Sequence, residues 1–303
     1  MYRIDDATAA TSLPAPEAAG TEGYFTEGNP TAGTPATNVR GSWLNMIQEE
    51  LRAIVVAAGL TPSKTTYTQV RDAIAQMYSP GRFLGVQTFT SSGTYTPGTY
   101  MVGGRSVTAT KARVRAVGAG GAGGSVTFTS GTQAAIGGGG NAGAYGEIFI
   151  ASGLSSQTVT IGAAGAPGAQ GNNPGSSGGA TSFGALLSCA GGAGGFGGAG
   201  AAPPFAVYSN GTVAGCSGTG TFVVSGKGAI GSLGSAFSLA SVSGGNGAAS
   251  PWGAGGAGGG GGVGTAAVGY GAGGGGAGQG ASAGAGAQGG AGAAGYLIVE
   301  EYA

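Results

Sequence analysis

Glycine is the feature that most constrains how this chain can fold. Between residues 118 and 295, 62 of 178 positions are glycine. Each glycine costs roughly 0.5 to 1 kcal/mol more than alanine to hold in one conformation, so ordering the whole tract carries an extra cost of about 30 to 60 kcal/mol. An ordered tract therefore needs a compensating interaction.

Close backbone packing can supply that compensation. Without Cβ atoms, extended helices with three residues per turn can approach one another and exchange backbone hydrogen bonds, as chains do at the crowded axis of collagen. Collagen itself is excluded, because the run from Gly253 to Gly264 keeps no strict Gly-X-Y repeat and the chain has only 12 prolines. We expect long insertions that resemble polyglycine helices.

Charged residues are scarce and unevenly distributed. Of the 22 in the chain, 14 lie in positions 1–82, whereas Lys227 is the only one between 148 and 299. This change indicates a domain boundary near residues 80 to 85. The chain has no histidine, which excludes histidine-based triads, histidine metal sites and imidazole proton shuttles.

The charge pattern also limits the partners. The net charge is zero, and nucleic-acid binding needs a concentrated positive field, so we expect no nucleic-acid partner. The one basic run is interpreted as the solvated face of a strand; it consists of Arg105, Lys111, Arg113 and Arg115. No secretory signal and no long apolar stretch is evident, so we expect no membrane insertion.

Sites for chemistry are equally scarce. Residues 118–123 match the dinucleotide pattern G-x-G-x-x-G, but no helix is predicted after them to receive a pyrophosphate. Beyond residue 83 the acids are Glu147, Glu300 and Glu301, too few to assemble a two-carboxylate site within one chain. We expect no enzyme activity, no cofactor and no metal. Cys189 and Cys216 are either two buried thiols or one disulfide.

Residues 1–40 are rich in Thr, Pro, Ala and Gly and predict an extended arm that packs on something else. Residues 41–82 predict two helices, at 42–58 and about 68–78, because apolar residues recur at spacings of three and four. Ser42 is expected to cap the first helix and Gly59 to end it. So small a module buries little surface, and we predict self-association through one stripe: Trp43, Ile47, Leu51 and Ile54. The alternative is an intramolecular two-helix hairpin.

From residue 83 onwards the apolar pattern has a period of two. Short runs bounded by Gly, Ser or Pro turns predict an all-β sandwich or small barrel. The predicted strands are 83–89, 112–117, 147–150, 157–161, 186–189 and 296–300. We expect the last strand to close the sheet that the first begins. The fold class is mainly β: a small N-terminal α-helical oligomerisation module, then a β-sandwich-like domain at 83–303 with long Gly-rich insertions.

Several uncommon runs occur in order near the N-terminus. They are Gly23-Tyr-Phe-Thr-Glu-Gly-Asn-Pro30, Gly33-Thr-Pro-Ala-Thr37, Trp43-Leu-Asn-Met-Ile-Gln-Glu-Glu-Leu51 and Ala57-Ala-Gly-Leu-Thr-Pro62. Through these runs, residues 2–78 resemble the N-terminal region of tailed-bacteriophage tail-fibre proteins. The resemblance implies a homotrimer, with the stripe from Trp43 to Ile54 as its trimer interface. It also implies attachment to a phage tail or baseplate protein, which we assign to Tyr24, Phe25, Asn29 and Pro30.

The remainder is similar to the glycine-rich C-terminal domain of phage tail fibres and adhesins. The likeness is carried by Phe89–Thr96, Ala112–Gly121 and Gly295–Tyr302. It implies a β scaffold with polyglycine helices, and tip loops that bind a host surface receptor, which is a glycan, an outer-membrane protein or a pilus. Such a virion protein is assembled in the host cytoplasm. Because a long repetitive shaft is missing, we expect a short fibre or a tip.

Aromatic side chains are sparse in the glycine tract, and large rings bury much area at low entropic cost when they bind a partner. The predicted receptor-binding residues are Phe205, Tyr208, Asn210, Trp252 and Tyr270. The alternative is that these rings fill a small core between glycine helices, which is our interpretation of Phe196.

Other functions remain as alternatives. A structural tail component would use the glycine tract only to build the fibre. A capsule depolymerase would need clustered carboxylates. An ice-binding protein would present flat arrays of Thr or small residues, without a specialised N-terminal arm.

Overall fold

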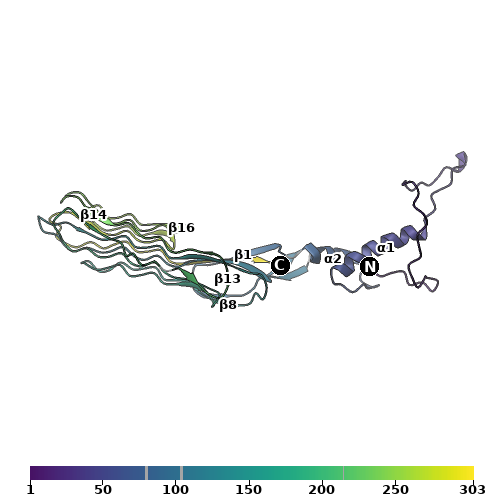
Figure 1. Ribbon diagram of the computed structural model, residues 1–303, viewed down its shortest axis with the longest axis horizontal. Coiled ribbons are helices and arrows are strands. Elements are labelled where there is room, and N and C mark those ends of the chain that lie inside the picture. The colour runs from purple at the N-terminus through teal and green to yellow at the C-terminus, as the bar shows by residue number, and fades with distance from the viewer. Residues whose placement is uncertain (79–80, 103–104, 214) are drawn as a thin grey trace. The chain divides into compact units, whose positions relative to one another are not determined.

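The computed structural model describes residues 1–78, 81–102, 105–213 and 215–303. The chain forms two compact units, Met1–Arg82 and Phe83–Ala303 (Figure 1). The first unit holds the two α-helices found among these residues, and the second consists of strands and extended segments. The predicted fold class is confirmed: the chain is mainly β with a small helical N-terminal part.

In the first unit, α1 (Gly41–Ala57) and α2 (Gln69–Tyr78) pack against each other as a hairpin. Val55, Ala58 and Ala73 are buried between them, and Ile54, Leu60 and Val70 pack around this cluster. The helix α1 ends as predicted, because Gly59 adopts a φ of 73°. The Leu60 N–H then donates to the Val55 carbonyl at 3.1 Å, which satisfies an otherwise free carbonyl at the helix end.

The predicted start of α1 is wrong in its detail. The N-cap residue is Arg40, whose side chain makes no capping hydrogen bond. The Ser42 hydroxyl instead donates to Glu17 at 2.9 Å, and Glu17 also pairs with Arg40 at 3.3 Å. The helix begins at Gly41, so Ser42 lies within its first turn and not at the N-cap position.

Two five-stranded antiparallel sheets form a sandwich at one end of the second unit. The first has the order β1–β19–β5–β7–β13: Phe83–Phe89, Tyr296–Tyr302, Lys111–Val117, Tyr145–Ile150 and Thr221–Ser225. The second has the order β12–β10–β9–β8–β2: Cys216–Ser217, Leu187–Cys189, Thr181–Phe183, Gln157–Thr160 and Gly93–Tyr95. Each of the six predicted strands is present, and β19 pairs with β1, so the last strand closes the first sheet as expected.

The core of the sandwich lies between these sheets. Val114 and Leu297 of the first sheet and Phe183 and Leu187 of the second are fully buried in one cluster. In β5 and β19 every second residue is buried, which is the alternation of a strand with one face on the core.

Short strands complete the second unit. They are β3 (Thr99–Val102), β4 (Arg105–Thr108), β6 (Ala135–Ile136), β11 (Phe205–Val207), β14 (Gly234–Ala236), β15 (Val242–Ser243), β16 (Trp252–Ala254), β17 (Val268–Tyr270) and β18 (Gly278–Gln279). The strands β11, β14 and β15 form a three-stranded sheet, and β3–β4, β6–β18 and β16–β17 are pairs.

The glycine-rich segments form a lattice of extended chains joined by backbone hydrogen bonds. Within residues 118–126, every third N–H donates to the same neighbour. Residues 118, 121 and 124 bond to segment 138–144, residues 119, 122 and 125 to segment 173–179, and residues 120, 123 and 126 to segment 287–293. This repeat of three is that of a polyproline II type helix, so the expected polyglycine packing is present.

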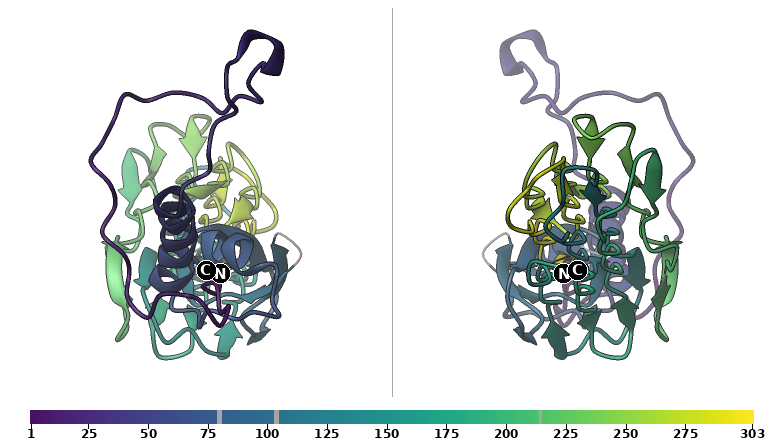
Figure 2. Two further views of the ribbon diagram at one scale, coloured as in Figure 1. Left: turned by 90° about the vertical axis from the view of Figure 1, so that its right-hand side faces the viewer. Right: turned by 90° about the vertical axis from the view of Figure 1, so that its left-hand side faces the viewer.

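Three of these segments, residues 118–126, 134–144 and 271–277, are buried in the interior of the lattice. Figure 1 shows the green and yellow segments side by side, and the end-on views of Figure 2 show them lying around one another. Only glycine fits at the closest approaches: a Cβ on Gly120 would overlap the Ala272 carbonyl, and one on Gly124 would overlap the Phe196 carbonyl. The run at 118–123 that matches the dinucleotide pattern is therefore interior packing.

Candidate functional site

The distal loops lie at the end of the lattice that is far from the two five-stranded sheets. In Figure 1 the label β14 marks this end, and β16 lies nearer the sheets. The distal loops comprise residues 127–133, 168–174, 199–208, 235–243 and 279–286. They are tied to one another: the Thr129 N–H donates to the Ala283 carbonyl at 3.0 Å and the Ser282 N–H to the Ser130 carbonyl at 2.9 Å. A rigid lattice thus presents these loops together.

Two predicted receptor-binding residues lie in or beside the distal loops, with different exposure. Phe205 is half-buried in β11 and packs on a small core that includes Ile136 and Ala236. Tyr208 is 70% exposed. Phe205 therefore fits the interpretation as a core ring, whereas Tyr208 is free to meet a partner.

Asn210 is half-buried and held by a buried polar side chain of the lattice interior. The Asn141 amide nitrogen donates to the Asn210 carbonyl at 2.7 Å and to the Thr212 carbonyl at 3.0 Å. The Asn141 amide oxygen accepts from the Ser209 hydroxyl and from the Gly231 N–H, each at 3.0 Å. Asn141 therefore fixes the segment that follows Tyr208. Asn210 contributes its backbone carbonyl to this arrangement, and its side-chain oxygen accepts from the Thr212 N–H at 3.0 Å.

Trp252 and Tyr270 are placed elsewhere. They face each other across β16 and β17 and lie over the first sheet, where Trp252 contacts Tyr145 and Tyr296 edge to face at ring-centroid distances of 5.3 and 5.4 Å. Tyr270 stacks on Tyr296 at 4.3 Å. The structure thus separates the predicted receptor-binding residues into two groups, because β16–β17 returns the chain to the base of the lattice.

Other exposed rings were missed by the sequence reasoning. Phe128 and Phe237 are 68% and 73% exposed in the distal loops. Phe196 is 47% exposed, so its interpretation as a buried plug is wrong. The signal that could have found Phe128 and Phe237 is the local loss of glycine around each, since residues that leave the lattice no longer need the close backbone approach.

The predicted attachment residues lie in the exposed arm of the first unit. Residues 26–37 close on themselves: the Asn29 N–H donates to the Thr34 carbonyl at 2.8 Å, and the Asn29 side chain caps the short 3₁₀ turn η1 (Pro30–Ala32). Pro30 is the first residue of that turn. Tyr24 is 98% exposed. Residues 26–37 thus form a preformed hook, in which no side chain is buried.

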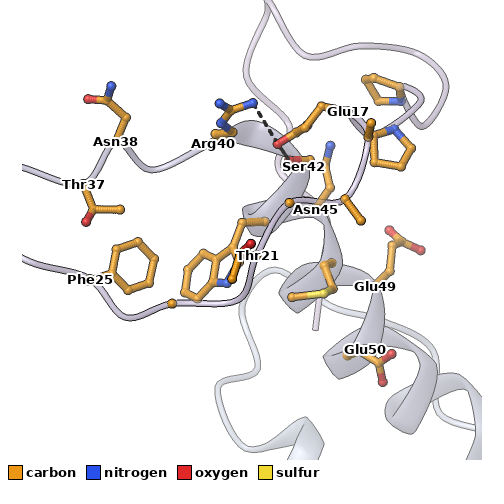
Figure 3. A pocket seen from close by; sticks show the side chains of 18 of the residues that line it. Glu17, Thr21, Phe25, Thr37, Asn38, Arg40, Ser42, Asn45, Glu49 and Glu50 are labelled. Atoms are coloured by element: carbon orange, nitrogen blue, oxygen red, sulfur yellow. Dashed lines mark hydrogen bonds and ion pairs between the residues drawn. The ribbon is translucent and has the colours of Figure 1, made fainter.

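A groove of about 820 Å³ lies between the arm and the first turns of α1 (Figure 3). Phe25 from the arm meets Trp43 edge to face at 4.9 Å, so one predicted attachment residue touches one predicted trimer residue. Trp43 and Met46 are 41% and 55% exposed in this region. Of the other trimer residues, Ile47 and Leu51 are half-buried, and Ile54 packs within the helical hairpin.

Cys189 and Cys216 are joined as a disulfide between the neighbouring strands β10 and β12. Gly146 of β7 lies directly beneath it, since a Cβ there would approach both sulfur atoms within 2.8 Å. The disulfide therefore packs on the core side of the first sheet. Within the described ranges, no group of His, Cys, Asp or Glu residues could hold a metal ion, and neither described helix is long and apolar enough to cross a bilayer.

No protein-family profile matches the chain. The uncharacterized protein StfP of Escherichia coli (strain K12) is 40% identical to it over 74 residues. This similarity covers 24% of the present chain and 34% of the length of StfP. The chain is therefore similar to StfP over a part of each protein.

Proposed function

We propose that the chain is a component of a bacteriophage tail fibre, attached to the virion through its first unit and bound to a host surface receptor through its second. The observation that carries this proposal is a rigid, almost uncharged glycine lattice whose distal loops expose aromatic rings. Recognition concentrates in loops held by a rigid scaffold, and rings such as Tyr208, Phe128 and Phe237 supply contact area at low entropic cost. The partial similarity to StfP and the resemblance of residues 2–78 to tail-fibre N-termini support it.

The first unit suits attachment. Its hook at residues 26–37 is closed by its own hydrogen bonds, so a tail or baseplate protein can bind it without ordering a flexible peptide first. The arm is also anchored to α1 and to the connection between the helices, because Arg3 pairs with Glu49 at 2.5 Å and Asp5 with Lys64 at 2.6 Å.

Self-association as a homotrimer is part of the same proposal. The start of α1 keeps Trp43, Leu44 and Met46 exposed, and adjacent exposed apolar side chains indicate a contact surface. A trimer would multiply weak receptor binding through effective concentration. Light scattering of the full chain should give three times the chain mass. A Trp43→Glu, Met46→Glu variant should reduce that mass, whereas Tyr67→Glu, at a 95% exposed position, should not.

The receptor function is tested by binding of the labelled full chain to a panel of intact bacterial strains. We expect saturable, strain-restricted binding. Tyr208→Ser and Phe237→Ser should weaken it, since each removes an exposed distal ring. Tyr67→Ser is the matched control, because it removes an exposed ring from the first unit.

Two results would contradict the proposal. Folded chain that binds no strain on a broad panel favours a structural tail component without receptor binding. An equal loss of binding in Tyr67→Ser and Tyr208→Ser would remove the distal loops from recognition.

A further inference from the structure

The outer face of the first sheet carries a band of aromatic and charged side chains that the proposed function does not use. Residues directly opposite each other in antiparallel strands share a face, so the register arranges these side chains in rows. The successive rows across β7, β5 and β19 are Tyr145, Val117 and Tyr296; Glu147, Arg115 and Ile298; Phe149, Arg113 and Glu300; then Lys111 and Tyr302. The other face of these strands is buried in the sandwich.

Aromatic rings stand at both ends of the band. At one end Trp252 packs on Tyr145 and Tyr296. At the other end Tyr302 meets Phe83 and Phe149 at ring-centroid distances of 5.9 and 6.5 Å. Residues two apart on a strand are separated by about 6.6 Å, so the rows extend over about 20 Å. This length suits an extended chain molecule better than a single small ligand.

Over the band as a whole, cations outnumber acids, because Lys111 lies in its last row. Arg113 pairs with Glu147 at 2.6 Å and Arg115 with Glu300 at 2.5 Å, whereas Lys111 has no ion pair among the described residues. Three cations against two carboxylates leave a net charge of +1 on this face. Lys111 therefore supplies the unpaired positive charge of this face.

The exposed side chains of the band are concentrated towards its Lys111 end, whereas the side chains of Arg115 and Glu147 are 26% and 3% exposed. Arg113 is 43% exposed at its side chain, Phe149 is 38% exposed, and Lys111 and Tyr302 are half-exposed. The sequence pattern predicted that the basic run lies on a solvated strand face. Lys111, Arg113 and Arg115 lie on this outer face, and the side chain of Arg105 lies outside the described residues.

We propose that this face binds an acidic polysaccharide, whose sugar rings stack on the aromatic residues at the two ends and whose carboxylates meet Lys111, Arg113 and Arg115. Flat aromatic rings present an apolar surface to sugar rings, and arginine side chains bind carboxylates with two parallel hydrogen bonds. This binding surface is separate from the distal loops, so it goes beyond the receptor contact proposed there.

The charge of the face selects this occupant over a second copy of the chain. If the same face of two copies met, the surplus positive charge of one copy would face that of the other, and like charges across an interface oppose association. An anionic chain instead neutralises the surplus charge, and binding should weaken as salt screens it.

The test uses calorimetric titration of the full chain with an alginate hexasaccharide, a polyuronate, and with maltohexaose as the neutral sugar. We expect alginate to bind saturably, more weakly at high salt, and maltohexaose to bind less. Lys111→Gln should weaken alginate binding about threefold to tenfold, and Phe149→Ser should also weaken it. Lys227→Gln is the control, because the stem of Lys227 lies beside Gly215, next to β12 of the other sheet.

Three outcomes would overturn the inference: no binding of alginate by the unaltered chain, an equal loss in Lys227→Gln, or a change in oligomeric mass in Lys111→Gln without a change in binding. The last would make the face a contact between copies. Tyr208→Ser should keep full alginate binding. If this variant loses host-cell binding but still binds alginate, the two binding surfaces are separate, and this inference can be tested apart from the distal-loop function.

Discussion

The hydroxyl of Tyr95 donates a 2.6 Å hydrogen bond to the carboxylate of Glu301, and both side chains are fully buried. Tyr95 belongs to β2 of the second sheet and Glu301 to β19 of the first. The same carboxylate accepts from the Gly98 N–H at 2.7 Å, from Gln87 at 3.2 Å and from the Tyr100 hydroxyl. One buried acid thus joins the two sheets and the start of β3.

Removal of the Tyr95 hydroxyl should destabilise the second unit. Tyr95→Phe leaves the ring in place but takes one donor from a buried carboxylate, which should lower the free energy of unfolding by about 1 to 3 kcal/mol. Denaturant unfolding of the second unit measures this. Tyr208→Phe, at an exposed position, should change it by less than about 0.5 kcal/mol; an equal loss in both variants would contradict the assignment.

The stability of the second unit should fall in acid because of Glu301. Burial by itself raises the pKa of this carboxyl, but the hydrogen bonds from Gly98, Tyr100 and Tyr95 outweigh burial and hold the pKa below its ordinary value of 4.5. A folded-state pKa below the unfolded one stabilises the protein above the unfolded value, and this contribution is lost as pH falls through the folded value. Glu301→Gln should be less stable at neutral pH and show a shallower loss below pH 4.5. An unchanged acid profile in this variant, measured by denaturant unfolding at each pH, would exclude Glu301 as the cause.

Tyr100 should make the stability of the second unit fall at alkaline pH. Burial first, and then its hydrogen bond to Glu301, raise the pKa of Tyr100 to about 12. A raised pKa contributes stability that is complete below the unfolded value of 10.0 and is lost as pH rises towards the folded value. Tyr100→Phe should remove this part of the alkaline decline in unfolding free energy. A decline that is identical in the variant would assign it to other groups.

The lattice should not tolerate a methyl group at Gly124. Its Cβ would overlap the backbone carbonyl of Phe196, and interior segments cannot separate without breaking several backbone hydrogen bonds. Gly124→Ala should therefore cost about 3 kcal/mol or more, or prevent folding of the lattice. Gly284→Ala is the matched control, since nothing lies within 4 Å of its Cβ position. Thermal unfolding compares the two, and similar stability in both would mean that the segments are packed less closely than described.

Loss of the Asn141 side chain should loosen the segment after Tyr208 before it affects the sandwich. Asn141→Ala leaves the carbonyls of Asn210 and Thr212 and the N–H of Gly231 without their partner. Amide hydrogen exchange should become faster by about tenfold or more at 209–213 and 231. Asn172→Ala, at an exposed position, is the control and should leave that exchange unchanged. Faster exchange across the whole second unit would indicate global rather than local destabilisation.

The sequence by itself determined the elements whose pattern is local. Apolar residues at spacings of three and four located α1 and α2, and the period of two located the six predicted strands. Gly59 marked the end of α1, because that position needs a residue that readily adopts a positive φ. The density of glycine likewise indicated close backbone packing, since such packing can offset the entropic cost of ordering glycine.

Only the tertiary structure decided which segments are neighbours. Glycine carries no side chain to distinguish one segment from another, so the register of the lattice comes from hydrogen bonds between residues as distant as Gly120 and Ala293. The same nonlocal pairing explains why Asn141 is buried, why Trp252 and Tyr270 lie over the first sheet and why Phe196 is half-exposed. The sheet register also decided two further contacts, because side chains from separate strands meet only once the strands are paired. It brought Cys189 to Cys216, and it placed Arg113 and Arg115 beside Glu147 and Glu300.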